Sequence, residues 1–366
     1  MATETIKDIA DYLESLAPLA YQEDYDNCGL IIGNQRDHVT GILIALDCTE
    51  AVVDEAIATS CNLIVAHHPI LFKGIKKLTG GTYVESVIIK AIQHRIGIYA
   101  IHTNLDNVLN GVNKKIASRI GLANLQILQP KRDLMKLVTF IPKDQEVVVT
   151  ANLHKAGAGQ IGNYKNCSFS VSGKGRFTPG EGASPVKGAL NQPETVEEVR
   201  VEVIFSAHLQ RSILNALRES HPYEEVAYYL SELQNENLEV GAGLVGELEV
   251  PEDTHSFLHR LKSTMNTGCI RHTKVTTQKV QKIAICGGSG SFLLQKAIAH
   301  RADVFISSDF KYHEFFDANG KIIIADIGHY ESEQFTKELI GEFLREKFPT
   351  FAIAFSKVVT NPISYL

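Results

Sequence analysis

Residues Asn62–Gly74 read NLIVAHHPILFKG, and this stretch decides how the rest of the chain is interpreted. Its apolar run, residues 63–66, has the length and composition of a buried strand. His67 and His68 follow directly, and Pro69 ends a regular strand because it lacks a backbone N–H. A break there lets both imidazoles turn into one crevice. Because neutral histidine is the commonest metal ligand, the pair indicates a metal site; a core histidine beside an exposed one is the alternative on this stretch alone.

The composition is that of a globular protein with two or three domains. The chain has 366 residues, more than one ordinary core accommodates, and 44% of them are hydrophobic. No apolar run is long enough to span a bilayer, and residues 4–16 form an acid-containing amphipathic helix, unlike a targeting peptide. The net charge of −6 does not indicate nucleic acid or an anionic membrane as a partner. Six cysteines without a CxxC pair are typical of a reducing compartment, so we expect a cytoplasmic protein.

Strands and helices alternate on both sides of the histidine pair. A strand is predicted at 41–47, a helix capped by Thr49 at 49–60, and another strand at 96–102 with Asp106 shortly after it. This alternation is typical of parallel α/β layers, in which ligands gather at the carboxyl ends of the strands.

The pattern changes between about Leu134 and Val245. Strands at 136–143, 197–206 and 225–230 and helices at 146–156 and 209–220 fit a ferredoxin-like α+β unit. From Pro251 the α/β alternation returns, with strands at 282–286, 302–307 and 321–327. The predicted fold is therefore α/β, with two α/β halves forming one metal-binding unit around an inserted ferredoxin-like domain. The predicted domains are 1–130, 131–245 for the insert, and 246–366.

Further metal-ligating residues follow other predicted strands. His329 and Glu333 lie one helical turn apart and project from the same face. With Asp106 and the histidine pair they provide three imidazoles and two carboxylates, and Glu333 could bridge two ions. Such donors without thiolate fit zinc, iron, manganese or cobalt. Taken singly, each residue also has an ordinary structural explanation, such as a helix N-terminal acid favoured by the helix dipole.

The order of the motifs resembles that of a known family. The segments NLIVAHHPILFKG, IHTNLDN, ICGGSG, SSDFKYHE and DIGHYESE together resemble the GTP cyclohydrolase 1 type 2 homolog family, also called Nif-three-like proteins. The chain is similar to the longer bacterial form, which carries an inserted PII/CutA-like domain, and the resemblance covers nearly the whole chain. It implies two divalent metal ions, expected to be zinc, and a toroidal homohexamer whose metal sites face an internal cavity. The metal ligands that it implies are His67, His68, Asp106, His329 and Glu333.

Several nearby residues are candidates for supporting roles, and no catalytic residue is assigned. His102 and Asp309 could accept or donate a hydrogen bond behind the ligands. Asp26 could reach the crevice, or it could belong to a turn. Gly287–Gly290 could offer backbone N–H groups to a phosphate, although the segment is not a complete phosphate-binding motif. Three lysines could hold an anionic substrate or could simply be solvated: Lys73, Lys76 and Lys77.

Three functions are compatible with this sequence. The first is a metal-dependent hydrolase acting on a nucleotide-like or phosphate-bearing small molecule. The second is a metal-handling or cofactor-insertion protein, and the third is a regulatory scaffold with an effector-binding insert. Open coordination positions beside a general base would favour the hydrolase.

Overall fold

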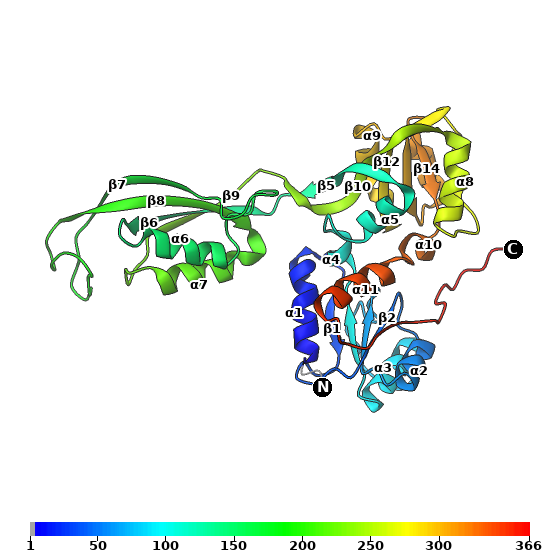
Figure 1. Cartoon of the computed structure of the whole chain (residues 1–366), viewed down its shortest axis with the longest axis horizontal. Helices are drawn as coiled ribbons and strands as arrows, with labels where there is room; N and C mark the ends of the chain where they lie inside the picture. The colour runs from blue at the N-terminus through cyan, green and yellow to red at the C-terminus, as the bar shows by residue number, and fades with distance from the viewer. Residues whose placement is uncertain (1–3) are drawn as a thin grey trace. The chain divides into compact units, whose positions relative to one another are not determined.

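The structure is a computed structural model that describes residues 4–366, so the start of the predicted domain 1–130 lies outside the described residues. The chain forms two compact units, Met1–Gln129 with Glu239–Leu366, and Pro130–Leu238 (Figure 1). The second unit ends earlier than the predicted boundary at 245, because the chain from Asn237 onward already belongs to a strand of the first unit's sheet. No helix within residues 4–366 is long and apolar enough to cross a membrane.

The first sheet of the larger unit contains the strand that precedes the histidine pair. Its order is β1-β4-β3-β2-β15, and only β1 pairs in the antiparallel direction. The strands are β1 (Gly29–Ile32), β2 (Ile42–Ala45), β3 (Leu63–Ala66), β4 (Gly97–Ala100) and β15 (Ile353–Phe355). Every residue of β2, β3 and β4 is buried, as expected for parallel strands covered on both faces. The accompanying helices are α1 (Ile6–Leu16), α2 (Glu50–Ala58) and α3 (Tyr83–Gln93), with the 3₁₀ helix η1 (Leu19–Tyr21).

The starts of α1 and α2 differ in how they are capped. Thr5 and Asp8 form a capping box at the start of α1. Thr49 is the residue that precedes α2, but its side chain makes no capping hydrogen bond, so the predicted cap interaction is wrong. Its buried hydroxyl has no hydrogen-bond partner within the described residues.

The second sheet of the larger unit has the order β11-β14-β13-β12-β10-β5, with β12, β13 and β14 parallel. Its strands are β5 (Leu122–Lys131), β10 (Asn237–Asp253), β11 (Arg271–His272), β12 (Lys279–Ser289), β13 (Val304–Ser308) and β14 (Ile323–Asp326). The remaining α-helices of this unit are α4 (Thr103–Asp106), α5 (Val112–Ile120), α8 (Thr254–Thr264), α9 (Leu294–Ala299), α10 (His329–Glu333) and α11 (Thr336–Lys347). Two 3₁₀ helices, η3 (Ser291–Leu293) and η4 (Tyr312–Ala318), complete it.

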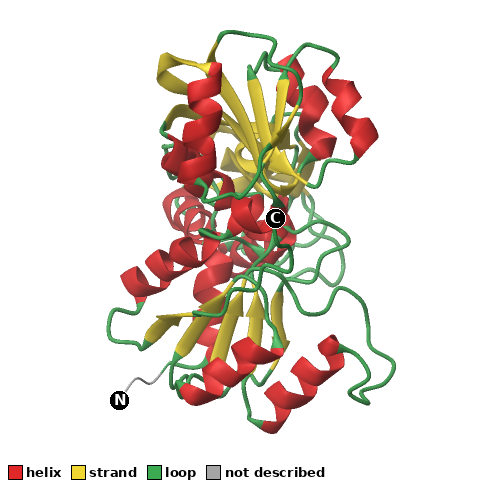
Figure 2. Cartoon of the chain, turned by 90° about the vertical axis from the view of Figure 1, so that its right-hand side faces the viewer, coloured by secondary structure: helices red, strands yellow, loops and turns green. Residues whose placement is uncertain are grey.

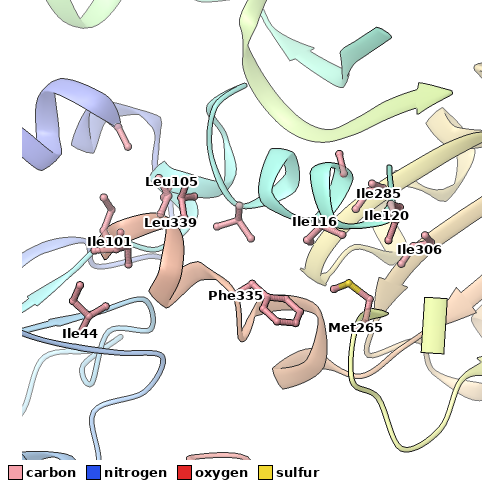
Figure 3. Packing of buried hydrophobic residues seen from close by; sticks show 14 of the residues in the cluster. Ile44, Ile101, Leu105, Ile116, Ile120, Met265, Ile285, Ile306, Phe335 and Leu339 are labelled. Atoms are coloured by element: carbon pink, nitrogen blue, oxygen red, sulfur yellow. The ribbon is translucent and has the colours of Figure 1, made fainter. Parts of the chain in front are cut away.

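One hydrophobic cluster joins the two sheets. It contains Ile44 of β2 and Ile306 of β13, together with Phe335 and Leu339 from the start of α11 (Figure 3). Figure 2 shows helices between the sheet near the N-terminus and the sheet above it. The two α/β halves therefore share one core, which brings the carboxyl ends of their parallel strands toward each other.

The smaller unit has its own sheet and its own core. Its elements run β6 (Leu134–Pro142), α6 (Glu146–Lys155), β7 (Phe169–Phe177), β8 (Glu194–Ser206), η2 (Ala207–Leu209), α7 (Gln210–Ser220) and β9 (Tyr228–Glu232). The antiparallel sheet has the order β7-β8-β6-β9. Val199, Val201 and Val203 of β8 pack with Ile213 and Leu217 of α7 in this core. Because side chains alternate along a strand, Glu198 and Arg200 belong to the opposite face.

Candidate metal centre

The five predicted ligands come together where elements of both sheets end. His67 and His68 directly follow β3, Asp106 is the last residue of α4, and His329 and Glu333 begin and end α10. Their donor atoms form overlapping groups within 4.8 Å that could hold metal ions. These groups are His67 with Asp106 and Glu333, His68 with His329 and Glu333, and His67 with His68 and His102.

Each of the four histidines has its Nδ1 atom fixed by an oxygen behind the cluster. These bonds are His67 to the Ile101 carbonyl at 2.8 Å, His68 to Asp47 at 2.7 Å, His102 to Asp26 at 2.8 Å, and His329 to Asp309 at 2.6 Å. In every case the oxygen accepts the Nδ1 proton, which leaves Nε2 for the cluster. Such outer partners typically set the tautomer and the orientation of metal-ligating histidines.

Asp309 reaches His329 through an unusual backbone conformation. It directly follows β13 and has a left-handed φ of 59°, which is uncommon for a residue other than glycine. Strained conformations of this kind cluster at functional sites. The hydrogen bond from His329 favours the ionised form of Asp309 and outweighs the opposing effect of burial. The pKa of Asp309 is therefore lowered.

Glu333 lies at the centre of the cluster and is only 2% exposed. Its Oε2 atom lies 2.9 Å from His68 Nε2 and 3.1 Å from His329 Nε2, while its Oε1 atom lies 3.8 Å from His67 Nε2. The two oxygens of one carboxylate thus face different histidines. This is the geometry that a carboxylate shared between two ions requires.

Two buried polar atoms at the cluster provide a test of whether a cation fits. His67 Nε2 and Asp106 Oδ1 are both buried, lie 3.7 Å apart, and have no hydrogen-bond partner within the described residues. Buried polar atoms without partners are costly and rare in native proteins. An imidazole nitrogen and a carboxylate oxygen that face each other without a hydrogen bond fit a divalent cation between them. The donor set, imidazole and carboxylate without thiolate, suits zinc, iron, manganese or cobalt.

The ionisable groups of the cluster stabilise one another. Burial opposes the charged form of His68, but hydrogen bonds to Asp47 and Glu333 outweigh it and raise the pKa of His68 to about 10. Burial also opposes the charged form of His329, but the charge of Glu333 and the hydrogen bond to Asp309 outweigh it. They raise the pKa of His329 to about 11. Burial raises the pKa of Asp106 to about 6. Burial would also raise the pKa of Glu333, but the charge of His329 and the histidine hydrogen bonds hold it well below its usual value.

The glycine-rich segment packs against the cluster instead of offering a phosphate site. The N–H of Gly287 donates to Asn113 and that of Gly288 donates to Ser332, both at 2.9 Å, so these two amides are not available to a phosphate. Gly288 has a left-handed φ of 62°, and a Cβ atom there would overlap Oε1 of Glu333. Position 288 therefore has to be glycine for the Glu333 carboxylate to occupy its place.

A cavity of about 620 Å³ adjoins the cluster. Exposed aromatic rings line it from four separate segments: Tyr25, Phe72, Tyr83 and Phe292. None of the described residues that line it is a lysine or an arginine. Lys73, Lys76 and Lys77 are exposed and lie outside this lining. The cavity has a size typical of small-molecule sites and presents aromatic surface beside the candidate metal-ligating atoms.

Two features of the site are not predicted from the sequence. Asp47 lies two residues after β2, as His68 lies two residues after β3, so its position after an apolar strand was an available signal. The C-terminal segment is the second feature, because Thr360 donates to Asp47, and Asn361 donates to Glu331 at 3.0 Å. Both tail residues line the cavity, although no helix or strand is assigned after β15.

Comparison with known proteins indicates which family the chain comes from. A family model described as Duf34/NIF3 (NGG1p interacting factor 3) matches residues 4–362. The chain belongs to the Duf34/NIF3 family. A Duf34/NIF3 relative from Staphylococcus epidermidis named "GTP cyclohydrolase 1 type 2 homolog" is 35% identical over 365 residues, covering 98% of this chain and 99% of the relative. A relative of the same name from Staphylococcus aureus is 36% identical, covering 99% of this chain and all of the relative.

A solved structure extends the Duf34/NIF3 comparison to the fold. The Bacillus cereus protein related to NIF3 has a TM-score of 0.86 at 35% identity, with both chains completely covered. The family and the mixed α/β fold predicted from the sequence are thus confirmed.

Proposed function

We propose that this Duf34/NIF3 protein is a dinuclear metal-dependent hydrolase acting on a nucleotide-like or phosphate-bearing small molecule. The observation that carries the proposal is the pair of buried, unpartnered atoms, His67 Nε2 and Asp106 Oδ1, beside a shared carboxylate and an open cavity. The name of the staphylococcal relatives, GTP cyclohydrolase 1 type 2 homolog, supports a nucleotide-like substrate.

The geometry suggests how the ligands divide between two ions. His67 and Asp106 would hold one ion and His68 and His329 the other, with Glu333 contributing an oxygen to each. Bound divalent ions supply a water of lowered pKa and polarise the substrate. We favour zinc, with iron, manganese and cobalt as alternatives that the same donors accept.

The protein's own residues would position the histidines and move a proton. Asp47, Asp309 and the Ile101 carbonyl keep three rings in the tautomer that presents Nε2. His102 is the candidate proton carrier, because Asp26 accepts its Nδ1 proton and the ring lines the cavity. Burial opposes ionisation of Asp26, but the His102 and Thr103 hydrogen bonds outweigh it and lower the pKa of Asp26. A charged Asp26 holds the His102 ring in the tautomer that presents Nε2, as a general base requires.

The remaining expectations from the family resemblance complete the proposal. We propose that the protein is cytoplasmic and assembles as a toroidal homohexamer. We also propose that the smaller unit, Pro130–Leu238, is a ferredoxin-like, PII/CutA-like module that binds an effector. The strand order β7-β8-β6-β9 and the separate core of that segment support its modular character.

A metal-handling role is the second candidate. The observation that favours it is the composition of the cavity lining, which contains no lysine or arginine among the described residues. Sites that recognise phosphate commonly use such cations. In this role the same ligands would hold an exchangeable ion for delivery.

Metal analysis combined with a hydrolysis screen distinguishes the two candidates. Purified protein would be remetallated separately with zinc, manganese, cobalt and iron, analysed for metal content, and assayed against nucleotides and phosphoesters. Turnover that is lost in both Glu333→Gln and His102→Gln, while only Glu333→Gln loses metal, supports the hydrolase. Stoichiometric metal without turnover, together with rapid transfer to a chelator, supports metal handling and contradicts the hydrolase.

A further inference from the structure

The smaller unit contains a second cavity, of about 1130 Å³. Its walls include residues of β7 and β8, the loop at 178–187, and residues 223–225. Figure 1 shows α6 and α7 on one side of this sheet. The cavity residues Glu198 and Tyr229 belong to the other face, because their strand neighbours Val199 and Tyr228 pack in the helical core.

A buried carboxylate lies in this cavity. Glu198 is 9% exposed, and its Oε1 atom accepts a hydrogen bond of 3.1 Å from the Tyr223 hydroxyl. No lysine, arginine or histidine among residues 4–366 forms an ion pair with Glu198, although Glu197 and Glu202 on the same strand are both paired. A buried carboxylate without a cationic partner is costly. The position therefore indicates a site where a ligand provides the missing positive charge.

The second carboxylate oxygen of Glu198, Oε2, accepts no hydrogen bond from the described residues. A Cβ atom at Gly175 would overlap the Glu198 carboxylate, so this carboxylate lies directly over the β7 backbone. Both residues line the cavity. A glycine at 175 leaves room for Oε2, and Tyr223 occupies only Oε1.

Aromatic rings surround this carboxylate. Phe177 and Tyr223 have ring centroids 6.2 Å apart, and Phe140 and Tyr229 have centroids 5.7 Å apart. All four residues line the cavity. Aromatic faces attract organic cations, and a carboxylate accepts their N–H hydrogen bonds.

Other ligand classes fit this cavity less well. Every described cluster of His, Cys, Asp and Glu that could hold a metal lies in the larger unit. An anion would meet the charge of Glu198. Four basic residues also line the cavity, but Arg200 is already paired with Glu202 at 2.7 Å and Lys187 with Asp144 at 4.0 Å. Lys174 and Arg176 alternate with Gly173 and Gly175 along β7, so they belong to the face opposite Glu198.

We propose that the cavity around Glu198 binds a small organic cation carrying a primary ammonium or guanidinium group. The cationic group donates to Glu198 Oε2 beside Gly175, and its carbon chain packs on Phe177 and Tyr229. This site goes beyond the proposed hydrolase, since none of its residues belongs to the metal cluster.

Calorimetric titration of the full-length protein tests the proposal. The probes are putrescine and agmatine, with 1,4-butanediol as the neutral counterpart of putrescine. Glu198→Gln keeps the side chain's size and removes its charge. Glu197→Gln is the matched control, because Glu197 is the neighbouring residue on the same strand and is exposed.

The expected result is that one of the diamine-like probes binds and butanediol does not. Glu198→Gln should weaken binding at least about tenfold, as expected for loss of a charged hydrogen bond, while Glu197→Gln should leave it within about twofold. Tyr223→Phe, which keeps the ring, should have an intermediate effect and serves if Glu198→Gln fails to fold. Binding that is unchanged in both variants, or no binding of either cation, overturns the proposal. So does a change of oligomeric state in Glu198→Gln without any cation binding, which would mean that a second copy covers the cavity.

Discussion

His68 donates its Nδ1 proton to Asp47 across 2.7 Å, so a carboxylate just after β2 orients a candidate metal ligand just after β3. Burial opposes ionisation of Asp47, but the hydrogen bonds that it accepts from His68 and Thr360 outweigh burial and lower the pKa of this carboxyl. Asp47 therefore stays ionised and holds the His68 ring with Nε2 toward Glu333.

Replacing Asp47 should weaken metal binding without removing a ligand. Asp47→Asn removes the charge that fixes the His68 tautomer, and we expect a loss of about 10- to 100-fold in affinity for the more weakly held ion. Competition with a fluorescent chelator measures this. Asp54→Asn on the exposed side of α2 is the control and should bind as the unaltered protein does. Equal affinity in both variants would show that Asp47 has no positioning role.

Glu333→Gln should lose more metal than His329→Ala. In the proposed dinuclear site, the substitution keeps the size of the side chain but would remove the charge that offsets two neighbouring dications, whereas His329→Ala would remove one ligand from one ion. We expect Glu333→Gln to lose at least one ion per chain while its circular dichroism spectrum stays unchanged. Metal content by mass spectrometry at matched pH measures both variants. If Glu333→Gln keeps two ions and His329→Ala loses both, the shared carboxylate is Asp106.

Gly288→Ala tests the contact between the glycine-rich segment and Glu333. A methyl group at 288 would overlap the Glu333 carboxylate, so we expect reduced metal content. Gly320→Ala is a close control, because Gly320 has a similar φ of 68° but no atom lies within 4 Å of its added Cβ. Both substitutions should cost about 1 kcal/mol or more of stability from the left-handed backbone, and only Gly288→Ala should lose metal. Equal metal content in the two variants would contradict this.

The metal-stripped protein should become less stable as the pH rises. The pKa values of His68 and His329 are raised to about 10 and about 11 in the folded protein, above the usual value of about 6.5 for histidine. Their contribution to stability is therefore complete below about pH 6.5 and is lost progressively as the pH rises through the folded-state values. Urea unfolding between about pH 6.5 and pH 9.5 measures the effect. His329→Gln should show a smaller decrease over the same range, and an equal decrease would exclude His329 as its source.

Removing the smaller unit should leave metal binding intact. The deletion is best made from Pro130 to Leu238, because strand β10 continues into the second sheet, where it lies beside β5. A short linker can therefore join neighbouring strands. We expect the shortened chain to keep its metal content and its α/β circular dichroism signal. Loss of both would show that the unit is required for folding and is not a separate module.

The strands that could be predicted from the sequence are those marked by a short, continuous run of apolar residues. Four-residue apolar runs such as 63–66 and 97–100 are recognisable strands, and polar residues just after them led to the ligands. β5 was not predicted, because its residues 122–131 mix apolar and polar side chains without regular alternation. The role of the tail was also not predictable, since Thr360 reaches Asp47 through tertiary packing, not through a local pattern. The same holds for the conformation of Asp309, which no neighbouring residue type requires.

Because the two α/β halves share one core, the candidate metal centre can form only late in the synthesis of the chain. His67, His68 and Asp106 leave the ribosome early, whereas His329 and Glu333 follow only after the whole smaller unit has been translated. The early residues alone complete neither of the two candidate groups that contain Glu333. We therefore expect a nascent chain to remain unable to load both ions until its last helices have docked on the first sheet. Full metal occupancy would then report that the segment with His329 and Glu333 has been translated and has packed in place.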